Sequence, residues 1–206
     1  MFYEKFQPLL TNFKNHISNT FPVLKGKKIL IACSGGLDSV VLSRLFKELN
    51  YNISLAHCNF SLRGKESDED EKFVILLADK LSIPIFNKKF NTKAYKIKHK
   101  LSTQVAARQL RYQWFDEVCT EHSFDYLATA HHLDDDLETF LINLSRGTGL
   151  RGLIGIPLIN DKIIRPFLNF PRADILQYAK EKNSPWREDS SNQTSDYLRN
   201  KLRIEV

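Results

Sequence analysis

The sequence predicts an α/β fold, with a doubly wound parallel sheet flanked by helices. Short apolar runs rich in β-branched residues alternate four times with longer segments of helical periodicity, the pattern of parallel strands joined by crossover helices. The chain has 206 residues, of which 42% are hydrophobic, enough for one sizeable core but marginal for two. We therefore expect one domain over residues 1–206, with its ligand site at the carboxyl ends of the strands.

The individual elements follow from these patterns. An amphipathic N-terminal helix precedes the first strand, and helical spacing of apolar residues resumes directly after the loop that follows that strand. A later basic stretch is interpreted as a solvated or disordered loop, with nucleic-acid contact as the second interpretation; it contains Lys93, Lys96, Lys98 and Lys100. The predicted strands span 28–33, 52–57, 83–87 and 125–130, and the predicted helices after the N-terminal one span 38–49, 67–81, 102–121 and 134–145.

The amino-acid composition of the chain changes at Arg146. The segment RGTGLRGLIGIP holds four of the eight glycines, and the residues after it are polar and lack clear strands. We expect residues 146–206 to form a loop and helical appendage built around the ligand site.

Composition sets broad limits on function. Thirty Lys and Arg against 24 Asp and Glu give a net charge of +6, which permits a polyanionic partner but equally describes a solvated mixed-charge surface. The three cysteines form no C-x-x-C pair, so a disulfide framework or zinc site is not expected and a reducing cytoplasm is the default location. We see no signal peptide and no apolar run of membrane length.

The stretch KKILIACSGGLDS, residues 27–39, predicts a phosphate site. An apolar strand runs into a loop whose glycines, Gly35 and Gly36, let the backbone approach an anion, and a helix then begins. Ser34 and Ser39 add hydroxyl donors. The loop lacks the Lys-Ser/Thr pair of a Walker A motif. Asp38 would repel phosphate unless Mg²⁺ lay between them, which suggests a bridging metal; the alternative is an ordinary capped strand-to-helix corner.

Acidic residues and histidines collect after the fourth predicted strand, in AHHLDDDLETFLINL. His131, Asp135 and Glu138 have the spacing of one helical face, with Asp134 at the helix start. Such a cluster can bind Mg²⁺ or a cationic amine. The alternative, an acidic first turn that complements the helix dipole, explains one or two of these carboxylates but not the whole group.

Two further segments carry candidate residues. His57 ends the second predicted strand, where a satisfied polar residue is an equally good interpretation, and Arg63 lies on the loop that follows. Arg108 and Arg111 share a helical face with Gln104. Two guanidinium groups on one face suit a carboxylate or phosphate, although either alone could simply be solvated.

The SGGLDS loop resembles the PP-loop ATP pyrophosphatases, which transfer the α-phosphate of ATP to an acceptor. The combined motifs resemble the catalytic domain of the tRNA(Ile)-lysidine synthetase family across nearly the whole chain. They are SGGLDS at 34–39, H-x-N-x-x-LRG at 57–64, AARQLRY at 106–112, AHHLDDDLET at 130–139, RGTGLRGLIGI at 146–156, RPF at 165–167, and WREDSSN with RNKLR at 186–203. Phe60, Asp136 and Ser190 depart from the pattern of that family, where His, Gln and Pro are usual.

This resemblance implies ATP-dependent ligation of L-lysine to C2 of the wobble cytidine in a tRNA(Ile) with a CAU anticodon, through an adenylated cytidine. It implies that Asp38 holds Mg²⁺ and that Asp135 and Glu138 bind metal or the lysine ammonium. His131 would assist proton transfer or hold the base, and Arg108 and Arg111 would bind the lysine carboxylate or the AMP phosphate. The residues implied in nucleotide binding are Ser34, Gly35, Gly36, Leu37, Asp38 and Ser39.

Two other functions remain open at this stage. A PP-loop tRNA thiolase would share the adenylation step but deliver sulfur, and a nucleotide-binding sensor would bind ATP without chemistry. Members of the lysidine synthetase family continue into further tRNA-binding domains, so we expect this chain to be a fragment of a longer protein.

Overall fold

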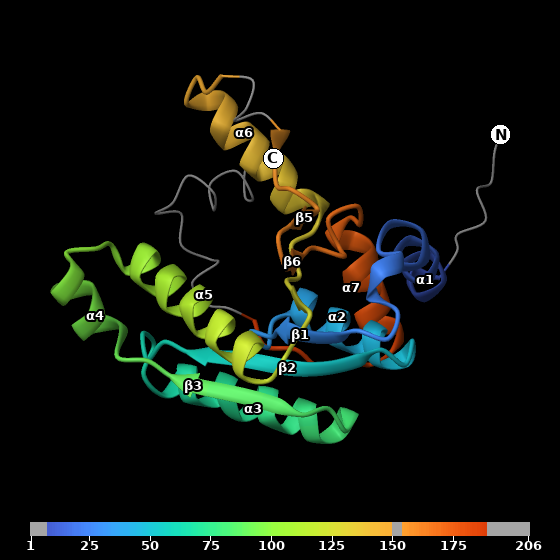
Figure 1. The fold of residues 1–206 in the computed structure, drawn as a ribbon, viewed down its shortest axis with the longest axis horizontal. Helices are drawn as coiled ribbons and strands as arrows, with labels where there is room; N and C mark the ends of the chain where they lie inside the picture. The colour runs from blue at the N-terminus through green and yellow to red at the C-terminus, as the bar shows by residue number, and fades with distance from the viewer. Residues whose placement is uncertain (1–7, 150–153, 189–206) are drawn as a thin grey trace.

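The computed structural model describes residues 8–149 and 154–188 as an α/β domain with a six-stranded sheet (Figure 1). The strand order is β3-β2-β1-β4-β6-β5. The strands are β1 (Lys28–Ala32), β2 (Asn52–Asn59), β3 (Ile85–Lys89), β4 (Tyr126–Ala128), β5 (Ile159–Asn160) and β6 (Ile163–Ile164). The helices are α1 (Leu9–Thr20), the short 3₁₀ helix η1 (Pro22–Leu24), α2 (Leu37–Glu48), α3 (Lys65–Leu81), α4 (Thr92–His99), α5 (Thr103–Glu121), α6 (Leu133–Ser145) and α7 (Arg172–Glu181).

The predicted parallel sheet is confirmed for its first four strands. β1 pairs in parallel with β2 on one side and with β4 on the other, so that Leu30 lies between Ser54 and Leu127. The chain thus extends the sheet outward through β2 and β3 and then returns to the other side of β1. That reversal creates a crevice at the carboxyl ends of β1 and β4, the usual ligand position in such sheets.

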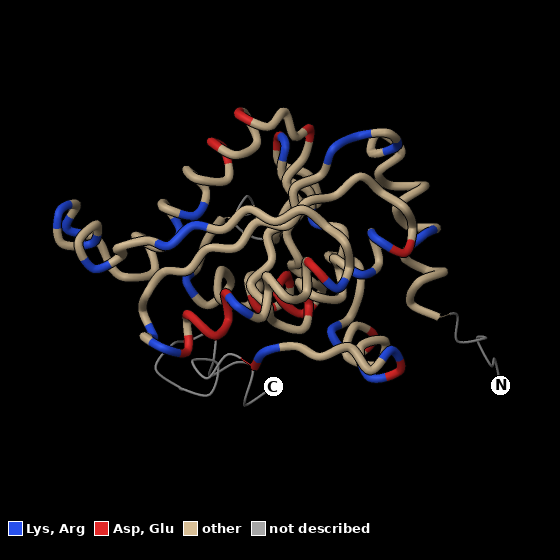
Figure 2. Tube along the Cα trace, turned by 90° about the horizontal axis from the view of Figure 1, so that it is seen from below, with Lys and Arg blue, Asp and Glu red and all other residues tan. Residues whose placement is uncertain are grey.

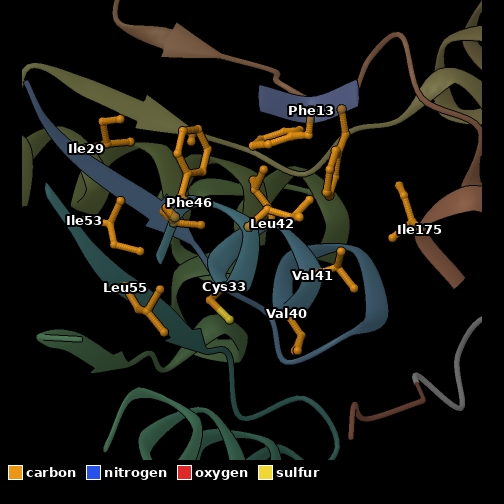
Figure 3. Packing of buried hydrophobic residues seen from close by; sticks show 14 of the residues in the cluster. Phe13, Ile29, Cys33, Val40, Val41, Leu42, Phe46, Ile53, Leu55 and Ile175 are labelled. Carbon is orange, nitrogen blue, oxygen red and sulfur yellow. The ribbon is translucent and has the colours of Figure 1, made fainter. Parts of the chain in front are cut away.

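Alternation along β1 explains why both faces of the sheet are covered. Ile29 and Ile31 face the core formed with α1, α2, α3 and α7, whereas Leu30 faces a second core formed mainly with α5. Figure 3 shows the first core, where Phe13 meets Phe46 edge to face at a centroid distance of 5.3 Å. Each such fully buried side chain contributes on the order of 1.5–3 kcal/mol. The strand that leads into the glycine loop is therefore fixed from both sides.

Residues 154–188 correct the expectation of an appendage. β6 pairs in parallel with β4, and β5 pairs antiparallel with β6. Phe167, Phe170 and Ile175 belong to the main core, and α7 contacts α2. The described part of this segment is therefore integral to the domain. Its two strands contain two residues each, too few to show an alternating pattern in the sequence.

The basic stretch around Lys96 was also predicted wrongly as a loop. It forms α4, whose first turn is capped by Asn91, with Oδ1 accepting a hydrogen bond from the Ala94 amide at 3.0 Å. The helix contains one branched apolar residue, Ile97, so it lacks the apolar periodicity that identifies a helix in sequence. None of the described helices combines the length and apolar character needed to cross a membrane.

Candidate active site

Hydrogen bonds within the loop between β1 and α2 give it a defined shape. The Ser39 hydroxyl donates to the Gly36 carbonyl at 3.0 Å and accepts from the Ser34 amide at 3.2 Å. It also lies 3.2 Å from the Ser34 hydroxyl. Ser39 is buried, and the Leu37 side chain belongs to the core. Ser39 and Leu37 thus shape the loop, whereas exposed Ser34 and the backbone of Gly36 face a potential ligand.

Gly35 is required by both conformation and space. Its φ is +90°, and a Cβ there would stand 3.1 Å from Val74 Cγ2 and 3.3 Å from Phe73 Cδ1. A side chain would therefore be strained by the positive φ and would crowd Val74 and Phe73 of α3. Gly35 thus lies against α3, whereas Ser34 and Gly36 on either side of it line a cavity.

The peptide between Gly35 and Gly36 is oriented by a distant residue. The Gly35 carbonyl accepts a hydrogen bond from the Arg187 amide at 2.9 Å. In a trans peptide, the carbonyl and the following N–H point in opposite directions, so this bond turns the Gly36 N–H away from Arg187. That N–H makes only a long bond of 3.3 Å to the Ser34 hydroxyl, and Gly36 lines the cavity. It is well placed to donate to an anion.

Ion pairs hold the Arg187 segment in place. Arg187 Nε donates to Asp70 Oδ1 at 2.8 Å and Nη2 donates to Glu69 Oε2 at 3.1 Å. Asp70 is buried, and its Oδ2 accepts from Arg63 Nη2 at 2.7 Å. We call Arg63, Asp70 and Arg187 the loop clamp. Sequence reasoning assigned no role to Arg187 or Asp70, and placed Arg63 only on a loop.

One side of the site is acidic. His132 Nε2 lies 3.5 Å from Asp135 Oδ2 and 3.8 Å from Asp38 Oδ2, distances that allow electrostatic attraction but not good hydrogen bonds. Arg172 Nε lies 4.0 Å from Asp38 Oδ1. Burial raises the pKa of Asp38, and the charge of Asp135 raises it further, whereas His132 and Arg172 oppose the shift.

The surroundings of Asp38 fit a cation. Its Oδ1 is buried and receives no hydrogen bond, and a cation there would relieve the desolvation of the carboxylate. Among the described residues, no group of three or more His, Cys, Asp or Glu side chains is arranged to hold a metal ion. Oxygen atoms from a bound nucleotide would have to complete the coordination of Mg²⁺.

The predicted helical face of His131, Asp135 and Glu138 needs correction. α6 begins at Leu133, so His131 precedes the helix, lines the cavity and lies with Nδ1 2.9 Å from the Thr129 hydroxyl. His132 is the N-cap, and its amide donates to Asp135 Oδ2 at 3.1 Å in a capping box. Asp135 lines the cavity, whereas Glu138 is buried on α6 and is absent from the lining.

The opposite side of the site is cationic and aromatic. The Arg111 guanidinium lies 5.2 Å from the centre of the Phe60 ring, and that of Arg108 lies 4.9 Å from the centre of the Tyr112 ring. Arg111, Phe60 and Tyr112 line the cavity, but Arg108 does not. Within the described ranges, neither arginine forms an ion pair with a carboxylate. Both remain able to bind an anion.

Arg165 is a further residue that sequence reasoning left without a role, although it lies in the quoted RPF motif. It follows β6, is buried, and donates from Nη1 to the Pro157 carbonyl at 2.5 Å. Burial lowers its pKa, and the positive charge of Arg108 lowers it further. A buried guanidinium beside a second one adds positive potential behind the cationic side of the site.

These two sides and the glycine loop enclose a cavity of about 420 Å³ at the carboxyl ends of β1, β2 and β4. That volume is in the range of small-molecule sites. Its lining comprises Ala32, Cys33, Ser34, Gly36, Asp38, Ser39, Ala56, Cys58, Phe60, Arg111, Tyr112, Phe115, Thr129, Ala130, His131 and Asp135. An anion-binding loop, a carboxylate pair and a free guanidinium therefore meet in one place.

Other candidates have structural partners or lie elsewhere. His57 is buried with Nδ1 2.9 Å from the Cys33 carbonyl, and burial lowers its pKa, so it supports the start of the loop. All three cysteines are free thiols, and burial raises the pKa of Cys58 to about 12. Most of the WREDSSN motif and all of RNKLR lie outside the described residues.

Comparison with known sequences places the chain among proteins with this loop. The sequence model of a family described as the PP-loop domain matches residues 6–206. A tRNA(Ile)-lysidine synthase of Bacteroides thetaiotaomicron is 43% identical over 89% of this chain and 43% of the relative. The corresponding protein of Porphyromonas gingivalis is 45% identical over 86% of this chain and 39% of the relative. The chain thus spans about two-fifths of the length of these curated relatives.

Solved structures share the fold at low sequence identity. A U34-tRNA thiolase from Methanococcus maripaludis, which carries a [4Fe-4S] cluster, superposes with a TM-score of 0.73 at 20% identity and covers 95% of this chain and 70% of that one. An NMN synthetase from Francisella tularensis superposes with a TM-score of 0.61 at 13% identity and covers 85% of this chain and 70% of that one. Both likenesses concern the fold alone.

Proposed function

Because this chain belongs to the PP-loop domain family, we propose that it forms the catalytic part of a tRNA(Ile)-lysidine synthase. It uses ATP to activate the wobble cytidine of a tRNA(Ile) with a CAU anticodon and joins L-lysine to C2 of that base. The observation that carries the proposal is the cavity in which an anion-binding loop lies between an acidic and a cationic side. The identity of 43–45% to lysidine synthases supports the choice of acceptor.

The reaction has two balanced steps. In the first, the C2 oxygen of cytidine attacks the α-phosphorus of ATP, and pyrophosphate leaves. In the second, the ε-amine of lysine attacks C2, its surplus proton is transferred to a base, and the C2–O bond breaks to release AMP. Each step moves negative charge onto a phosphate leaving group, so donors aimed at phosphate assist both.

The glycine loop binds the pyrophosphate end of ATP. The Gly36 N–H and the Ser34 hydroxyl face the cavity at the start of α2, where the helix dipole also favours an anion. Asp38 would hold Mg²⁺, which supplies positive charge to neutralise the phosphates when bound. Arg111, on the opposite side, binds the α-phosphate or the lysine carboxylate through its fork of N–H donors.

The acidic side receives the lysine ammonium. Asp135 lines the cavity, and buried Glu138 lies one helical turn further along α6, so their negative charge favours a cation at this end. His131 lines the same cavity, with Nδ1 2.9 Å from the Thr129 hydroxyl, and from this position it holds the base or accepts the proton of the attacking amine.

A thiolase function is disfavoured by the cysteines. A thiol that delivers sulfur or binds a cluster needs thiolate character, yet burial raises the pKa of Cys58 to about 12 and that of Cys119 to about 11. The pKa of buried Cys33 is raised as well. The free thiols also agree with the reducing, cytoplasmic location that we propose.

ATP–pyrophosphate exchange that depends on tRNA(Ile) tests the proposal. We expect exchange with the CAU transcript and none with a transcript whose wobble cytidine is replaced by uridine, followed by incorporation of radiolabelled lysine in the first case only. ATP binding without exchange would instead identify a sensor, and transfer of sulfur would identify a thiolase.

A further inference from the structure

Positive charge is concentrated in one stretch of the chain, residues 80–115. This stretch holds nine Lys and Arg residues and no Asp or Glu, although the whole chain has 30 basic and 24 acidic residues. The other 170 residues therefore carry 21 basic against 24 acidic side chains. The net charge of +6 thus arises entirely from this stretch.

Four of these cations form what we call the α4 basic surface: Lys93, Lys96, Lys98 and Lys100. All four are exposed, and none forms an ion pair within the described part of the chain. The lysines of neighbouring β3 behave differently, since Lys88 pairs with Glu117 at 3.1 Å and Lys89 with Asp68 at 2.6 Å. In Figure 2 the α4 region at the far left carries Lys and Arg residues, in blue, without Asp or Glu residues, in red.

The helix dipole does not account for this charge. Lys96 and Lys98 lie in the last turn of α4, where cations are favoured by about 0.3–1 kcal/mol. Lys93 is the second residue of the helix, and the first turn contains no acid. A cation at that end opposes the dipole, so the position of Lys93 is not explained by the stability of the helix.

The α4 basic surface adjoins the cavity of the proposed active site. The Thr92 hydroxyl donates to the Phe60 carbonyl at 2.8 Å, and the Phe60 ring lines the cavity beneath the Arg111 guanidinium. A second hollow of about 380 Å³ lies along α4, lined by Leu62, Thr92, Lys93, Lys96, Ile97 and Thr103. Phe60 thus connects the cavity and Arg111 to the first residue of α4, next to Lys93.

We propose that the α4 basic surface binds the sugar-phosphate backbone of the substrate RNA beside the nucleotide whose base enters the cavity. The inference rests on the proposed function. If the wobble base enters the cavity, the phosphates on either side of that nucleotide must lie along the edge of the cavity. Unpaired lysines neutralise phosphates without reading sequence, and apolar or aromatic side chains between cations suit the bases and riboses of a single-stranded loop.

The test is the salt dependence of RNA binding by the full chain. Filter binding of a tRNA(Ile) transcript is measured between about 50 and 200 mM salt for the wild type and for K93Q/K96Q/K100Q. The matched control, K14Q/K25Q/K180Q, removes the same charge from exposed lysines of α1, the turn after η1, and α7. Binding of Mg-ATP by calorimetry and circular dichroism spectra are recorded for all three proteins.

We expect the α4 variant to bind the transcript about tenfold more weakly at the low salt concentration and to lose about 2 from the slope of log K against log salt. The control should stay within about twofold of the wild type, and all three proteins should bind Mg-ATP equally. Equal slopes for the α4 variant and the control would contradict RNA binding by the α4 basic surface and would leave the proposed ligase function unaffected. A wild-type chain that binds Mg-ATP but no RNA would overturn this inference, whereas the proposed ligase function would be overturned by the absence of ATP–pyrophosphate exchange that depends on tRNA(Ile).

Discussion

The loop clamp predicts that a side chain outside the cavity controls nucleotide affinity. Replacing Arg187 with Ala removes two hydrogen bonds to carboxylates, at 2.8 Å to Asp70 and 3.1 Å to Glu69. Asp70 keeps its bond to Arg63, so the variant leaves no buried charge without a partner. The Arg187 amide remains, but it is no longer held against the Gly35 carbonyl by the side chain.

The size of the effect follows from these contacts. A hydrogen bond to a charged group contributes about 1.5–3 kcal/mol when sheltered, but the Arg187 side chain is 36% exposed, so solvent reduces the contribution of the pair to about 1 kcal/mol in total. If docking of this segment orients the Gly36 N–H, the affinity for Mg-ATP should fall about fivefold.

Isothermal titration with Mg-ATP measures the change. Lys182→Ala is the matched control, because it removes an exposed ion pair of 3.9 Å to Glu48 at the end of α7 without touching the loop. We expect wild-type affinity for this control and unchanged circular dichroism for both variants. Wild-type affinity in Arg187→Ala would refute the reasoning, since the loop would then hold its shape without the clamp.

Three further predictions concern the cavity. Asp38→Asn should abolish Mg²⁺-dependent ATP turnover yet raise the thermal midpoint at neutral pH. The pKa of Asp38 is raised in the folded state, so its ionisation destabilises the fold as pH rises above about 3.8; an equal or lower midpoint at pH 7.5, or retained turnover, would contradict this. Glu138→Gln should keep ATP–pyrophosphate exchange but impair incorporation of radiolabelled lysine, and normal incorporation would exclude an electrostatic role. Replacing Cys33, Cys58 and Cys119 together with Ala should leave lysine incorporation largely intact in a folded protein, whereas complete loss would point back to sulfur chemistry.

The sequence predicted the parts of the fold that have local, repeated signals. Strand β1 and helix α2 showed clear periodicity, and the glycines between them indicated the anion site directly. The two-residue strands β5 and β6 gave no such signal, because their place in the sheet is fixed by pairing with β4 and not by their own pattern. Helix α4 was missed because its few apolar residues do not recur with helical periodicity.

In the candidate site, too, features with a local sequence signal were predicted and features fixed by distant contacts were not. The acidic cluster was recognisable and the helix start was predicted to within one residue of Leu133, but His131 was put on a helical face that it does not share, and His132 was overlooked as the N-cap. The loop clamp could not be predicted from the sequence, for a different reason. Arg187 and Asp70 are 117 residues apart, and neither residue type at its position predicts the other.

The hydrogen bond from Arg187 to Gly35 also bears on the order in which the protein becomes functional during synthesis. The loop leaves the ribosome early, whereas the residue that orients its central peptide is made about 150 residues later, after the strand that extends the sheet beyond β4. At about 5–20 residues per second, this separation amounts to roughly 8–30 s. A nascent chain that still lacks Arg187 has the complete glycine loop in its sequence but not the contact that aims its amide. We therefore expect unfinished chains to bind the nucleotide less tightly until the sheet, α7 and the segment after it have been made.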